Sequence, residues 1–128
     1  MTPRKSLNAV TDKGWEPRFL ARFFRALAPM FADRPDEIRI EQRKSKLQVR
    51  WDGKNAFVPL KTSLHGYAAD AFLRILILSG MSIALEGVEQ TGKLRVRYGQ
   101  QVVPIRVASR RDDGSWYLVF WPVWKLQR

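Results

Sequence analysis

Residues 93–107 have the sequence KLRVRYGQQVVPIRV, and this stretch decides the fold. Before Gly99-Gln100, apolar residues alternate strictly with Lys93, Arg95 and Arg97, as they do in a strand with one buried face. After it, Val103, Ile105 and Val107 occur at every second position, with Arg106 between the last two. A glycine between two such runs favours a tight turn, so we expect two adjacent strands joined at this point. The apolar positions predict the core side of the pair, and the basic residues between them then share the opposite side.

The patterns on either side of this pair complete an α+β domain. Further strands are predicted over residues 37–41, 47–51, 56–58 and 116–124. Asp52-Gly53 predicts a tight hairpin turn, and residues 110–115 predict a polar loop. Residues 66–78 have the apolar spacing of a helix, which Gly80 is expected to end. The order predicts one domain over residues 35–125, an antiparallel sheet with packed helices.

An amphipathic helix is predicted over residues 14–34, after a flexible leader over residues 1–13. Its apolar stripe repeats every four residues, at Trp15, Phe19, Phe23, Leu27 and Phe31. Pro29 indicates that the helix ends or bends near its end. The pattern leaves open whether the stripe packs on its own sheet or on another molecule. In the second case, the expected docking surface is formed by Trp15, Phe19 and Phe23.

The composition excludes several classes of protein. A chain of 128 residues that is 45% hydrophobic suits one folded domain and is too apolar for disorder. It has no cysteine and one histidine, which excludes disulfides, thiol nucleophiles, cysteine-bound zinc and histidine-rich metal sites. We expect the protein to use no metal or other cofactor. Its apolar runs are far shorter than the ~20 residues of a membrane-spanning helix, which favours a cytoplasmic location. The formal net charge of +11 favours polyanionic partners.

A near match to a phosphate-binding loop occurs at residues 87–94. Gly87, Gly92 and Lys93 have the spacing of G-x-x-x-x-G-K, but Leu94 stands where serine or threonine should bind magnesium. Such a loop opens a helix, whereas the residues that follow here alternate as a strand. We therefore interpret Gly92-Lys93 as the beginning of a strand and expect no enzymatic activity from it.

Four cations form the candidate binding site, which we call the basic face: Lys93, Arg95, Arg97 and Arg106. Cations gathered on one small area repel one another unless an anion lies between them, and the arginine guanidinium pairs bidentately with oxyanions. The basic face is therefore a candidate site for phosphate or for an acidic partner. The alternative is a solvated surface without a ligand.

The order of motifs resembles the domain that precedes the motor domain in type II secretion and type IV pilus assembly ATPases. Six family motifs have counterparts in this chain: S-D-I-H-I-E at residues 36–41, V-R-x-R-I-D-G at 47–53, K-I-L-A-G-L-D-I-A at 76–84, Q-D-G-R-I at 90–94, L-R-V-S at 105–109 and, weakly, G-E-x-x-V-x-R-L at 114–123. The 128 residues contain no motor domain, and Lys93 replaces a family arginine.

The resemblance implies a PAS-like fold and a role for two residues of the basic face. The family's Q-D-G-R and L-R-V-S segments reach toward nucleotide held by the motor domain, which implies such a role for Lys93 and Arg106. The expected function is that of a non-enzymatic adaptor or regulator of a pilus or secretion motor. Its partners would be the motor ATPase or its membrane platform, with the protein cytoplasmic or peripheral at the inner membrane.

Two other functions fit the same charge. A nucleic-acid-binding module would use the excess of cations together with exposed tryptophan. A basic amphipathic helix could instead attach to an anionic membrane, although Pro17 and the short helix argue against this. The sequence leaves the oligomeric state open.

Overall fold

A computed structural model describes residues 5–10, 18–43, 46–59, 67–112 and 115–124. Its elements are, in order, β1 (Leu7–Ala9), α1 (Arg18–Phe31), β2 (Ile38–Arg43), β3 (Lys46–Trp51), β4 (Lys54–Pro59), α2 (Tyr67–Leu78), β5 (Gln90–Tyr98), β6 (Gln101–Asp112) and β7 (Ser115–Pro122). The predicted α+β class with an antiparallel sheet is confirmed. The resemblance's PAS-like fold stays a prediction.

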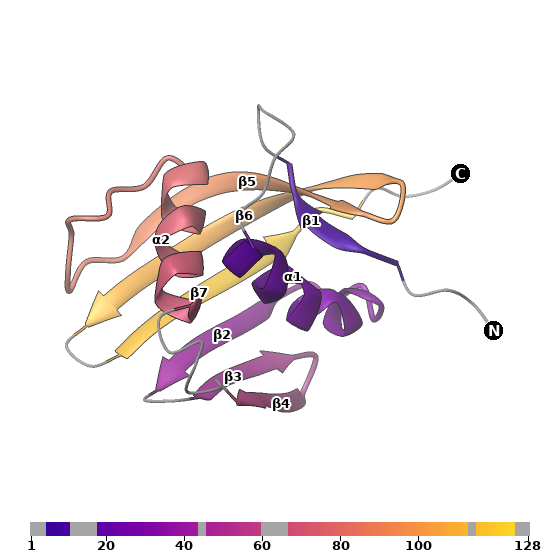
Figure 1. Cartoon of the computed structure of the whole chain (residues 1–128), viewed down its shortest axis with the longest axis horizontal. Helices are drawn as coiled ribbons and strands as arrows, with labels where there is room; N and C mark the ends of the chain where they lie inside the picture. Colours follow the sequence, from indigo (N-terminus) through magenta and orange to yellow (C-terminus); the bar gives the residue numbers. More distant parts are fainter. Residues whose placement is uncertain (1–4, 11–17, 44–45, 60–66, 113–114, 125–128) are drawn as a thin grey trace.

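All the strands join one antiparallel sheet in the order β1-β5-β6-β7-β2-β3-β4. Two meanders, β5-β6-β7 and β2-β3-β4, meet where β7 pairs with β2, with Ile40 opposite Leu118. In Figure 1 both helices lie over the same side of this sheet, in front of its strands. The other side of the sheet carries no described helix, and we call it the open side.

The turns follow the local signals. Asp52 and Gly53 both have positive φ, 48° and 76°, as a two-residue hairpin between Trp51 and Lys54 requires. Gly80 has φ 76° and ends α2, where the Met81 amide donates to the Leu76 carbonyl at 2.8 Å. This bond, with that of the Gly80 amide to Ile77, satisfies carbonyls that the helix end would leave unpaired.

The apolar stripe of α1 packs on the chain's own sheet. Phe23, Leu27 and Phe31 of this stripe are at most 1% exposed and belong to the single core that includes α2 and the sheet. Leu20 and Phe24, beside the stripe on the same helix, are fully buried in the same core. The Phe24 ring stacks on Phe120 of β7 with a centroid separation of 6.4 Å. The helix is therefore part of the domain rather than an element placed before it. It also continues through Pro29 to Phe31.

Two predictions about irregular segments were wrong. Residues 7–9, predicted as part of a flexible leader, form β1, which pairs with the edge of β5 from Leu7 opposite Tyr98 to Ala9 opposite Val96. Residues 5, 6 and 10 of the predicted leader belong to no helix or strand. Residues 1–4 and 11–13 lie outside the described residues. The polar loop at 110–115 is shorter than predicted, because Arg110–Asp112 continue β6 by pairing with Ser115–Tyr117.

Candidate phosphate-binding face

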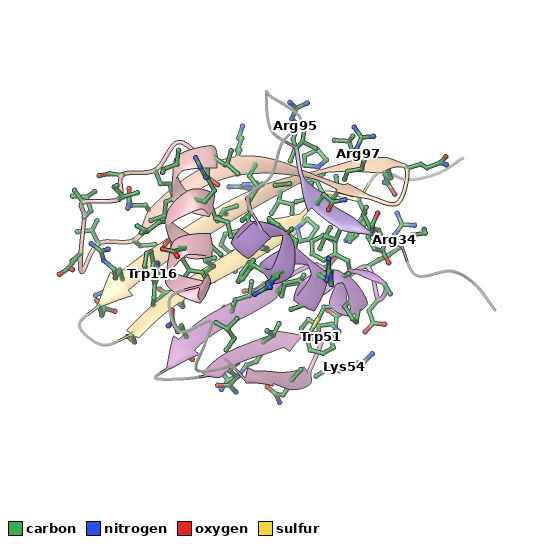
Figure 2. All side chains as sticks on the ribbon, viewed as in Figure 1. Arg34, Trp51, Lys54, Arg95, Arg97 and Trp116 are labelled. Carbon is green, nitrogen blue, oxygen red and sulfur yellow. The ribbon has the colours of Figure 1, made fainter. Side chains whose placement is uncertain are left out.

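The β5–β6 hairpin brings the four predicted cations onto the open side of the sheet. Lys93 lies directly opposite Arg106 in the register, and Arg95 and Arg97 follow at every second position of β5. All four side chains are exposed. The residues that alternate with them along β5, Leu94, Val96 and Tyr98, are buried beneath the helices. Figure 2 shows Arg95 and Arg97 projecting outward beyond the ribbon of β5. The predicted shared face is confirmed, and its role as a binding site stays a prediction.

No described residue neutralises the basic face. None of its four cations forms an ion pair or hydrogen bond with a residue in the described ranges. Other arginines of the same sheet do have carboxylate partners: Arg39 with Glu37 at 2.7 Å, and Arg110 with Asp112 at 3.0 Å. The bond to Asp112 raises the pKa of Arg110 above its ordinary value.

Like charges directly opposite each other on paired strands destabilise a sheet. Lys93 and Arg106 therefore repel each other, and an anion that lies between them removes this repulsion.

Three of these cations line one depression. A cavity of about 560 Å³ is bordered by Lys93, Arg95 and Arg106. Its apolar lining residues are Val10, Leu78 of α2, Leu94, Pro104, Ile105 and Val123. An anion in this depression would contact cations from two strands at once. Its size suits a phosphate with part of the group that carries it.

An exposed tryptophan extends the basic face across a third strand. Trp121 of β7 pairs with Arg106, and its side chain is 36% exposed on the open side. The nearly continuous apolar run of residues 116–124 predicts a core position for Trp116, Trp121 and Trp124. Trp116 is 8% exposed and packs edge-on against Phe72, so the core assignment is correct there. Trp121 has the opposite parity, which the continuous apolar run of residues 116–124 conceals.

The predicted docking surface on the first helix is corrected at one position. Phe23 is fully buried, with its ring edge-on to Phe72 at 5.6 Å and to Phe24 at 5.7 Å. It therefore cannot contact a partner without unfolding of the core. Trp15 and the side chain of Phe19 lie outside the described residues.

Other candidate chemistry is not assembled by the described residues. The near match to a phosphate-binding loop lies in a strand, as predicted: β5 contains Gly92, Lys93 and Leu94. No helix follows them among the described residues, whereas a phosphate-binding loop is followed by a helix. Within the same ranges, no group of three histidine, cysteine, aspartate or glutamate side chains is placed to hold a metal ion. Neither α1 nor α2 has the length and apolar content needed to cross a bilayer. Comparison with protein-family models and with curated proteins gives no match to this chain.

Proposed function

We propose that the protein is a non-enzymatic binding module whose basic face holds the phosphates of a single-stranded nucleic acid. One observation carries the proposal: four exposed cations without a described partner lie on adjacent strands, beside an exposed tryptophan. Cations that track a backbone and aromatic rings that stack on bases are the two components of single-strand binding.

The linear arrangement favours an extended polyanion. Lys93, Arg95 and Arg97 occur at every second residue, so successive side chains lie about 6.7 Å apart along the strand. Successive phosphates of an extended single-stranded nucleic acid can each contact one of these cations. Trp121 lies on β7, the strand next to Arg106 and two strands from β5. A base of the bound nucleic acid can stack on its exposed ring there.

Binding of labelled oligonucleotides tests the proposal. Fluorescence anisotropy is measured with an oligothymidylate of about 15 nucleotides and with a duplex of the same length. We expect the single strand to bind more tightly. Trp121→Ala should weaken its binding by about 1–3 kcal/mol, the contribution of one stacked base. Preference for the duplex, or full binding by Trp121→Ala, would contradict the single-strand proposal.

The adaptor function is the second candidate. It is supported by the order of the six motifs and by the direct opposition of Lys93 and Arg106, the two positions that the resemblance links to nucleotide. An antiparallel sheet with helices on one side is compatible with the PAS-like fold of that family. An arginine supplied in trans can stabilise charge during phosphoryl transfer, and this gives Arg106 a mechanism. On this proposal the protein lies at the inner membrane beside the motor.

A pilus or secretion motor ATPase distinguishes the two candidates. As an adaptor, the protein should change the motor's rate of ATP hydrolysis, and Lys93→Ala/Arg106→Ala should abolish this change while the variant keeps its far-ultraviolet circular dichroism. An unchanged hydrolysis rate with the wild-type protein, together with tight binding of the oligothymidylate, would reject the adaptor function.

A further inference from the structure

A second cavity lies on the helix side of the sheet, away from the basic face. It measures about 820 Å³ and opens between α1, β1 and the residues that follow β7. Its apolar lining comes from four separate parts of the chain: Leu7, Ala21, Ala28, Pro29, Ala32, Tyr98 and Trp124. The small alanines of α1 leave this space beside β1, which lies next to the helix in Figure 1. We call this the α1–β1 cavity.

One wall of the α1–β1 cavity is a packed aromatic cluster. The rings of Tyr98 and Trp124 lie 6.3 Å apart, and Phe31 packs behind both at 5.8 Å. The indole of Trp124 donates a hydrogen bond of 2.9 Å to the carbonyl of Pro35, which fixes the orientation of its ring. This wall is therefore preformed.

The charges at the α1–β1 cavity are all positive among its described lining residues. Lys5, Arg25 and Arg34 border the space, and no aspartate or glutamate does. The ammonium of Lys5 lies 5.2 Å from the centre of the Tyr98 ring, and the guanidinium of Arg34 lies 5.0 Å from the centre of the Trp124 ring. These contacts hold two of the cations against the aromatic wall. Arg25, from α1, has no ion pair with a described residue.

Tyr98 adds a neutral donor to this wall. Burial raises the pKa of the Tyr98 hydroxyl, and the negative charge of Asp33 raises it further, so the hydroxyl stays protonated. It has no hydrogen-bond partner among the described residues. A protonated phenol beside a cation is suited to donate a hydrogen bond to a bound anion.

We propose that the α1–β1 cavity binds a small organic anion with an apolar body. Ligand cavities commonly measure about 300–1,000 Å³ and combine apolar walls with a few polar groups that orient the ligand. Here the aromatic wall and the alanines of α1 contact the body of the ligand. Arg25, Lys5 and the Tyr98 hydroxyl bind its carboxylate or phosphate. The site lies on the opposite side of the sheet from the basic face, so it does not depend on the proposed nucleic-acid binding.

Calorimetric titration with two anions tests the proposal on the full chain. Sodium laurate combines a carboxylate with an alkyl chain, and adenosine monophosphate combines a phosphate with a planar base. We expect saturable binding of one of them, and the outcome identifies which body the cavity accepts. Dodecanol has the chain of laurate without its charge, and it should bind at least about tenfold more weakly if laurate is the ligand.

Three single-residue variants locate the binding. Arg25→Ala removes an anion contact and Ala28→Leu fills the cavity, so each should weaken binding at least about tenfold. Arg22→Ala removes an equal charge from α1 at an exposed position that does not line the cavity, and its affinity should match the wild type. All three place good helix formers in α1, and thermal unfolding verifies that they fold. Absence of binding by both anions, or equal binding by wild type, Arg25→Ala and Ala28→Leu, would overturn the proposal.

Discussion

Replacing both Lys93 and Arg106 with alanine removes two of the four cations of the basic face. The affinity for single-stranded nucleic acid should then depend less steeply on salt concentration. Each phosphate contact to a single strand contributes about −0.7 to the slope of log affinity against log salt. Four contacts give a slope of about −2.8, so affinity falls about 50-fold between about 50 mM and 200 mM salt. With two contacts left, the slope is about −1.4 and the fall is about sevenfold.

The slope is measured by anisotropy titrations of the labelled oligothymidylate at several salt concentrations. The slope is a sharper test than affinity at one salt concentration, because a substitution that perturbs the fold lowers affinity without reporting how many counterions are released. Both arginine and lysine contacts release counterions, so the count does not depend on their different hydrogen-bonding geometry.

A matched variant separates the basic face from the general charge of the protein. The double variant Arg22→Ala/Arg74→Ala also removes two positive charges, but from α1 and α2 on the helix side of the sheet. We expect this variant to keep the wild-type slope. Equal slopes for the two double variants would show that binding follows net charge rather than the basic face, and the proposed site would be refuted.

Three further predictions concern the fold. Phe23→Ala should destabilise the domain by about 3–5 kcal/mol in urea unfolding, because its ring is fully buried against Phe24 and Phe72; a loss below about 1 kcal/mol would contradict a core role. Gly92→Ala should cost about 1–3 kcal/mol in the same assay, since its new methyl group would overlap the carbonyl oxygen of Ser79, and wild-type stability would show that this contact relaxes freely. Hydrogen bonds from the Lys54 ammonium and then the Trp51 indole, whose side chains lie close together in Figure 2, hold the pKa of Asp33 below its ordinary 3.8. This stabilisation is present above that ordinary pKa and is lost as the pH falls through the lower folded-state value, so Asp33→Asn should be less stable than wild type at neutral pH and equal to it in strong acid. A stability difference that does not change with pH would contradict this.

Local signals in the sequence predicted most of the elements. A two-residue period specifies a strand and its two faces, so residues 93–107 were sufficient to predict the strands β5 and β6 and the shared side of the basic face. Asp52-Gly53 and Gly80 also acted locally, because positive φ is a property of a single residue and its turn. These features depend on neighbours within a few positions.

Features that depend on distant pairing were missed. β1 has three residues, too few for a periodic signal, and it is a strand because it finds the free edge of β5. Trp121 belongs to a run in which both parities are apolar, so its exposed side became known only from its pairing with Arg106. The α1–β1 cavity is likewise formed by segments from both ends of the chain.

The sequence by itself determined the α+β class, the strand periods, the turns and the grouping of four cations. The tertiary structure decided what covers each face. The pattern of an amphipathic helix predicts that its apolar stripe is buried, but it does not indicate what covers the stripe. The free energy gained by burial is similar whether the chain's own sheet or a partner covers it. Only the packing of α1 on β7 and α2 settles this for Phe23, because burial depends on contacts between residues far apart in the chain.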